Sequence, residues 1–457
     1  MTIKQNDFSQ GSMSGNILRQ AIPLIIANAV QVLYNVVDRI YLGHLSDTNS
    51  LALTGVGLIF PLVALVTAFC NLFASGGAPL CSMARGSGQP ERAERIQNTT
   101  FTMLVLTGVV LTGVLYAFRK PILYLFGASD DTYIYANAYL QIYLAGTVFS
   151  MVSTGMNGFI NAQGFPRIGM LTVLLGAVLN ILLDPLFIFV LDMGVRGAAL
   201  ATVISQAVSC VWVLRFLTGK KALLKLKKSM LRPDLPLLKQ TTALGIPGFI
   251  MSATNALVQA TCNATLRQYG NDLHIGIMTV VNSMREIFSL PSHCLSHAAQ
   301  PVISYNYGAK QFRRVRSGIS FMSLLGVILM IVCWILILSF PKPLLSLFTN
   351  DQQLIQTGGR AMQIHFFGFF MMSLQFAGQS TFVALGKSKQ AVFFSLLRKV
   401  LIVFPLTLWL PTVGNLGTDG VFLAEPISNF VGGAACFITM MRTVWPQLKQ
   451  QERLQQH

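Results

Sequence analysis

Asp38 is an acid inside a long apolar stretch, residues 17–45, where a carboxylate has to be explained. An ionised side chain at the centre of a bilayer costs at least about 2.5–3.5 kcal/mol. Other polar residues precede it at spacings of three and four, which places them on one face of a helix. We predict that this face lines a water-filled cavity, the alternative being a hydrogen-bonded seam between helices. Its members are Asn28, Gln31, Tyr34, Asn35 and Asp38.

A second acid lies in the apolar segment LNILLDPLF, residues 179–187. Asn180 and Asp184 are four residues apart and share a helix face, and Pro185 can loosen the helix so that backbone carbonyls become available. Thr202, in the next apolar segment, adds a hydroxyl. Together with Asp38 these side chains would make an all-oxygen site suited to a hard cation. Because two close carboxylates can also share a proton, the pattern permits Na⁺, H⁺ or competition between them.

The elements that must position these residues are transmembrane helices. The 457 residues are 53% hydrophobic and only 11% charged, against roughly 25% charged in soluble domains. The apolar runs are long enough for spanning helices and too long for the strands of a membrane barrel. The seven cysteines all lie in apolar segments without a CxxC pair, which indicates packing rather than disulfides or a metal cluster. We therefore expect an all-α polytopic membrane protein.

Breaks at glycine, proline and charged clusters predict twelve spans. The first six are 17–45, 51–83, 96–118, 132–162, 168–191 and 197–217, and the last six are 238–268, 274–306, 316–340, 354–385, 390–411 and 419–444. With loops assigned alternately, 23 Lys and Arg fall on the side of the termini and 5 on the opposite side. Five more lie in or beside helices: Arg39, Arg285, Arg360, Arg398 and Lys399. This bias predicts a cell-membrane protein with both termini in the cytoplasm.

The two halves of the chain resemble each other. KPILYLFGASDD (120–131) recurs 222 residues later as KPLLSLFTNDQQ, and GVRGAALATVIS (194–205) recurs 223 residues later as GTDGVFLAEPIS. We predict an N-lobe of helices 1–6 over 1–217 and a C-lobe of helices 7–12 over 238–457, related by a pseudo-two-fold axis along the membrane normal. For the basic linker 218–237 two roles are compatible with each other: an amphipathic segment on an anionic leaflet and a connector that fixes topology.

The C-lobe has no acid opposite Asp38 or Asp184, so we expect the cation site to be confined to the N-lobe. Arg285 and Glu286 are adjacent and face different directions, pairing across the lobe interface or lining a substrate path. For Arg398 and Glu425 a structural pair between helices is slightly favoured over substrate binding, and His293 and His297 are expected to pack rather than bind metal. The predicted substrate cavity comprises Met251, Met284, Glu286, Phe288, Met362, Phe366, Arg398 and Glu425.

Five segments, in order along nearly the whole chain, resemble multidrug and toxic compound extrusion (MATE) transporters, and most closely the MepA-like bacterial branch. They are IPLIIANAVQVLYNVVDRIYLG, LLDPLFIFVLDMGVRGAALATVISQ, AAQPVISYNYGAK, LLRKVLIVFPL and LAEPISN. The resemblance implies two six-helix lobes, alternating access, and export of amphipathic, mostly cationic compounds in exchange for Na⁺ or H⁺. It also implies that the N-lobe cation site is formed by Asp38, Asn180, Asp184 and Thr202.

The expected protein is thus a secondary transporter without a cofactor other than its coupling ion. Its expected partners are small molecules and the lipid bilayer, not nucleic acid, and we expect a monomer. One alternative is a flippase for lipid-linked precursors, which would require a large cationic cavity and more helices. A more remote alternative is a membrane-embedded enzyme using His293 and His297, for which a third catalytic member is missing.

Overall fold

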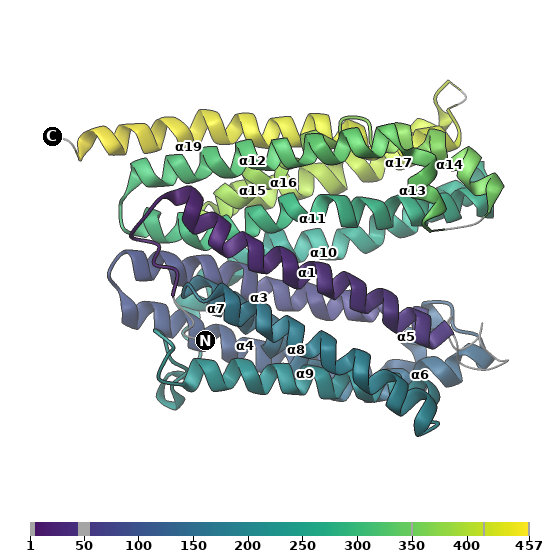
Figure 1. Ribbon diagram of the computed structural model, residues 1–457, viewed down its shortest axis with the longest axis horizontal. Coiled ribbons are helices and arrows are strands. Elements are labelled where there is room, and N and C mark those ends of the chain that lie inside the picture. The colour runs from purple at the N-terminus through teal and green to yellow at the C-terminus, as the bar shows by residue number, and fades with distance from the viewer. Residues whose placement is uncertain (1–4, 44–54, 349–350, 415, 456–457) are drawn as a thin grey trace. The chain divides into compact units, whose positions relative to one another are not determined.

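The structure is a computed structural model that describes residues 5–43, 55–348, 351–414 and 416–455, except the side chains of 35–40, 42–43, 256 and 272. Within these ranges every regular element is a helix, and the chain forms two compact units (Figure 1). The first unit contains 1–7 and 22–249, and the second contains 8–21 and 250–457. The predicted all-α fold is confirmed.

The helices of the first unit follow the predicted spans closely. They are α1 (Met13–Gly43), whose first turns belong to the second unit, α3 (Phe60–Gly86), α4 (Pro90–Ala117), α5 (Arg119–Leu125), α6 (Asp130–Ala145), α7 (Thr147–Ala162), α8 (Pro166–Pro185), the π-helix η1 (Leu186–Val190) and α9 (Gly194–Thr218). In this unit α3 and α4 pack on each other and on α7, and α8 packs on α9.

The second unit starts with three long helices and continues with shorter helices that are separated by 3₁₀ and π-helical segments. The long helices are α10 (Leu235–Tyr269, its first turns in the first unit), α11 (Asp272–Gly308) and α12 (Phe312–Ser339). The others are α13 (Pro341–Ser346), α14 (Gln352–His365), η3 (Phe369–Met371), α15 (Met372–Ala384), α16 (Ser388–Leu396), η4 (Leu397–Val403), α17 (Phe404–Trp409), η5 (Leu410–Thr412), α18 (Thr418–Ser428), η6 (Asn429–Gly433) and α19 (Ala434–Leu454).

Nine stretches of the described chain are long and apolar enough to cross a membrane. The other three predicted spans correspond to α6–α7, α11 and α14–α15. Two of these are broken at glycines that stand 222 residues apart, Gly146 and Gly368. Gly368 has φ +68°, and a β-carbon there would lie 2.1 Å from the Phe430 ring, so only glycine fits this turn. Hydropathy alone therefore undercounts the spans. Helix breaks divide two of them into shorter helices, and polar residues lower the mean hydropathy of the third.

Proline loosens α8 as the sequence predicted. Directly after Pro185 the chain forms the π-helical turn η1, in which the Leu191 amide donates to the Leu186 carbonyl. Two further π-helical segments, η4 and η6, lie in the second unit, and η6 begins three residues after Pro426. Such turns are rare and are frequent at functional sites, and these three adjoin the residues described below.

The basic linker is bound to the first unit. The Glu94 carboxylate accepts the Lys225 backbone amide at 3.2 Å and pairs with the Lys227 ammonium. The Gln163 side-chain oxygen accepts two linker amides at 2.9 and 3.0 Å, and Leu224 is 2% exposed. No α-helix forms between α9 and α10. These contacts fix the linker on the first unit, and both of its predicted roles, connector and amphipathic segment, stay predictions.

Candidate functional site

Asn180, Asp184 and Thr202 meet inside the first unit, on the facing helices α8 and α9. Their exposed fractions are 2%, 0% and 5%. The Asn180 amide nitrogen lies 3.4 Å from Asp184 Oδ1 and 3.3 Å from Thr202 Oγ1. With the amide turned over, its nitrogen donates to Asp184 Oδ2 at 2.9 Å and its oxygen accepts from the Thr202 amide at 3.3 Å. We call these three residues the Asp184 site.

The oxygen atoms of the Asp184 site suit a hard cation. The Thr202 hydroxyl donates its proton to the Ala198 carbonyl at 3.0 Å, and with the Asn180 amide turned over its lone pairs remain for a cation. A carboxylate, an amide oxygen and a hydroxyl are ligands that Na⁺ accepts, and the carboxylate can take a proton instead. Cation binding itself stays a prediction, as does the choice between Na⁺ and H⁺.

Asp38, the residue from which the cation site was inferred, lies in α1, and its side chain is outside the described residues, like that of Asn35. The other members of the predicted polar face have half-buried side chains, and the Asn28 amide donates to the Leu24 carbonyl at 2.8 Å. The proposed contribution of Gln31 and Tyr34 to a cavity stays a prediction.

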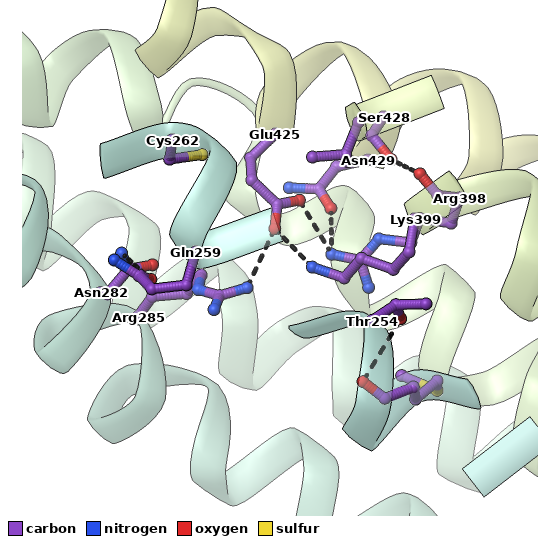
Figure 2. Close-up of polar contacts among 12 residues, drawn as sticks. Thr254, Gln259, Cys262, Asn282, Arg285, Arg398, Lys399, Glu425, Ser428 and Asn429 are labelled. Carbon is purple, nitrogen blue, oxygen red and sulfur yellow. Dashed lines mark hydrogen bonds and ion pairs between the residues drawn. The ribbon is translucent and has the colours of Figure 1, made fainter. Parts of the chain in front are cut away.

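The second unit buries a group of charges around one acid. Glu425 on α18 accepts from Arg285 of α11 at 3.0 Å and from Lys399 of η4 at 2.7 Å, and Arg398 lies 3.4 Å from its other oxygen. Arg398 also donates to the Asn429 side-chain oxygen at 2.9 Å. Figure 2 shows the Glu425 carboxylate between Arg285 and the Arg398–Lys399 pair. We call these five residues the Glu425 cluster.

The Glu425 cluster confirms one prediction and narrows another. Arg398 and Glu425 do form the favoured pair between helices. Arg285 pairs with Glu425 of its own unit rather than across the lobe interface, and its alternative role, lining a substrate path, stays a prediction. Sequence reasoning missed Lys399, because neighbours in an α-helix face different directions. Residues 397–403 are π-helical, and Arg398 and Lys399 both reach Glu425. A pair of basic residues in an apolar segment is the signal that would have found it.

A small cavity adjoins the Glu425 cluster. It offers about 20 Å³ to the centre of a water-sized molecule, which is room for one water or one small ion. Its charged and polar lining includes Arg285, Lys399, Glu425, His365, Asn282 and Gln259. We call it the Glu425 cavity.

The remaining candidates of the second unit lie mostly in its core. Met284, Met362 and Phe366 are each 0% exposed, and Phe288 packs against the hydrophobic core to which they belong. Met251 is half-buried and Glu286 is exposed. A substrate role for these residues stays a prediction. The rings of His293 and His297 lie 4.4 Å apart, and His293 also contacts the Phe376 ring. This is the packing role that the sequence favoured.

The MatE family model matches the chain twice, over residues 23–186 and 247–409. Together the two matches cover well over half of the chain.

The chain belongs to the MatE family.

The double match also confirms the internal repeat, because one family model describes both halves. The multidrug export protein MepA of Staphylococcus haemolyticus is 24% identical over 427 residues, covering 93% of each chain. That of Staphylococcus saprophyticus is 23% identical over 396 residues, covering 87% of each.

Solved structures of MATE transporters share the fold. One in complex with MaD3S superposes with a TM-score of 0.91 at 22% identity, covering 98% of this chain and 100% of the other. An outward-facing multidrug resistance MATE transporter gives 0.91 at 21% identity, with the same coverage. The fold is therefore that of MATE transporters, twelve helices in two lobes, and the chain is a multi-pass membrane transporter.

Proposed function

We propose that this MatE transporter is a secondary active antiporter that exports amphipathic, mostly cationic compounds in exchange for Na⁺ or H⁺. The observation that carries the proposal is the Asp184 site, where buried oxygen ligands from two helices converge in the first unit. A charge buried at this depth is costly and is retained where it has a function. Membership of the family and the export function named for the MepA relatives agree with this assignment.

The mechanism we propose is alternating access driven by the cation. A cation entering from outside neutralises Asp184 together with Asp38, and its unequal affinity for the outward and inward states shifts the population between them. Relieved of its negative charge, the first unit favours a state in which a cationic compound binds weakly and leaves. The π-helical turn after Pro185 lies directly beside Asp184 and supplies a point at which α8 can adjust.

In this proposal the protein lies in the cell membrane with both termini in the cytoplasm and works as a monomer. Its partners are small amphipathic molecules and the surrounding lipid. The coupling ion is the only cofactor.

Efflux of an ethidium-like dye from proteoliposomes with independently imposed Na⁺ and H⁺ gradients tests the proposal. We expect Asp38→Asn and Asp184→Asn each to reduce ion-driven efflux by at least about tenfold, since each removes the charge that a cation neutralises. Asp131→Asn is the matched control, because Asp131 is an exposed acid of the same unit, and it should transport normally. Wild-type rates for Asp38→Asn or Asp184→Asn under both gradients would refute the mechanism.

A further inference from the structure

The Glu425 cavity occupies the position of the Asp184 site in the internal repeat. The two family matches begin at residues 23 and 247, and the later motifs repeat at an interval of 223. These intervals give each residue of the predicted cation site a counterpart: Cys262 for Asp38, Val403 for Asn180, Thr407 for Asp184 and Glu425 for Thr202. All four counterparts line the Glu425 cavity. The Cys262 sulfur lies 3.9 Å from the Thr407 hydroxyl, so two of them are also in contact.

The charge at the repeated position is reversed. Where the first unit has Asp38 and Asp184, the second has a thiol and a hydroxyl, and three basic side chains surround the one acid, Glu425. Guanidinium groups keep their protons in proteins, so Arg285 and Arg398 leave an excess of at least one positive charge whatever the state of Lys399. The side chains of Arg398 and Lys399 are 3% exposed and that of Arg285 is 24% exposed, so the excess charge is largely shielded from water. Such a charge is costly without a counter-ion.

Hydrogen-bond donors around the Glu425 cavity are left over after the internal pairs are made. Lys399 uses one of its three protons on Glu425, and Arg285 Nε has no partner among the described residues. His365 also lines the cavity and is 3% exposed. Buried polar groups of a native protein are normally satisfied. The donors and the excess charge therefore require the same missing partner, an acceptor with negative charge.

We propose that the Glu425 cavity binds a small monovalent anion, either a free halide or the carboxylate of a transported compound. The space of about 20 Å³ admits one such group. The anion accepts from Lys399 and Arg285 in charge-assisted hydrogen bonds. The protein then carries sites of opposite sign at equivalent positions of its two units. This inference goes beyond the proposed antiport, since anion binding is measured without any gradient.

Anion titrations of the purified full-length protein test the proposal. Sodium is held constant, a bulky morpholine sulfonate too large for the cavity is the background anion, and chloride, bromide, formate or acetate is added. Because a ligand of the folded state raises the unfolding temperature by mass action, Tm should rise and saturate with a fitting anion. Bromide bound beside Arg285 and Lys399 should also appear by anomalous scattering in crystals of the wild-type protein.

Arg285→Gln should raise the half-saturating anion concentration at least about tenfold, since it removes one charge-assisted contact. Arg285→Lys keeps the charge and should restore most of the affinity. The matched control is Arg360→Gln, because Arg360 forms an exposed pair with Asp419 in the same unit, and its titration should equal that of the wild type. If Arg285→Gln fails to fold, the wild-type bromide position still decides the question.

The four anions distinguish the two sources. Saturation by chloride and bromide supports a free halide, saturation by formate and acetate alone supports a substrate carboxylate, and saturation by both kinds supports their shared site. Absence of any saturable effect together with absence of bromide at the cavity would overturn the proposal. An anion titration of a folded Arg285→Gln variant that equals that of the wild type would also overturn the proposal.

Discussion

The Asp184 site and the Glu425 cluster stand at the same place in two halves of one repeated sequence, yet their chemistry is opposite. The first gathers oxygen ligands around a carboxylate, and the second gathers three basic groups around its single acid. Both lie beside π-helical turns, η1 in the first unit and η4 and η6 in the second. The repeat thus conserves the position of a buried polar site and not its charge.

The comparison indicates different roles for Glu425 and Asp184. Glu425 is held by three cations and compensates part of their charge. Asp184 contacts the Asn180 amide and belongs, with Thr202, to a set of oxygen ligands that we propose binds the coupling cation. Removing Glu425 should therefore damage the fold, while removing the charge of Asp184 should damage coupling.

The largest effect on stability is expected for Glu425→Gln. Deleting one partner of a buried ionic group leaves uncompensated charge and typically costs about 3–5 kcal/mol. We expect the free energy of unfolding in detergent to fall by about this amount and to be partly restored by a bound anion. A fall below about 1 kcal/mol would mean that the cluster is solvated, and the contrast with Asp184 would be lost.

A smaller effect on stability is expected for substitutions at the two glycines that interrupt helices, Gly146 and Gly368. Gly368→Ala places a side chain at φ +68° and against the Phe430 ring, which should cost about 1–3 kcal/mol. Gly146 is the matched control. It has φ −88°, and a β-carbon there would lie 2.6 Å from Cγ2 of Val203. Gly146→Ala therefore adds a steric contact without left-handed backbone and should cost less when both variants are compared by thermal unfolding. An equal or greater loss at Gly146 would contradict the conformational argument.

The smallest effect on stability is expected for Asp184→Asn. The substitution keeps the size of the side chain and removes a buried charge, so the free energy of unfolding should change by less than about 1 kcal/mol. The same variant should lose ion-driven efflux. A large loss of stability would show that Asp184 is structural like Glu425, and the difference between the two sites would disappear.

The sequence predicted the helices well because spanning segments are set by length and hydropathy. It also brought Asn180, Asp184 and Thr202 together, since residues four apart share a helix face and adjacent helices pack. It gave Lys399 no role, because the π-helical turn that brings Arg398 and Lys399 to the same acid cannot be read from a pattern of apolar residues. It left the partner of Arg285 open, because helix spacing gives the direction of a side chain and not its partner on another helix.

The attachment of the linker to α4 has a consequence for biosynthesis. Glu94, Asn98 and Gln163 precede the linker in the chain, and their side chains bind its backbone at residues 223–227. These three side chains have therefore already been synthesised when the linker leaves the ribosome. The first half can close on its own trailing segment before most of the second half exists. The order of translation and the order of folding then coincide, and the first half can complete its contacts with the linker before the second half is synthesised.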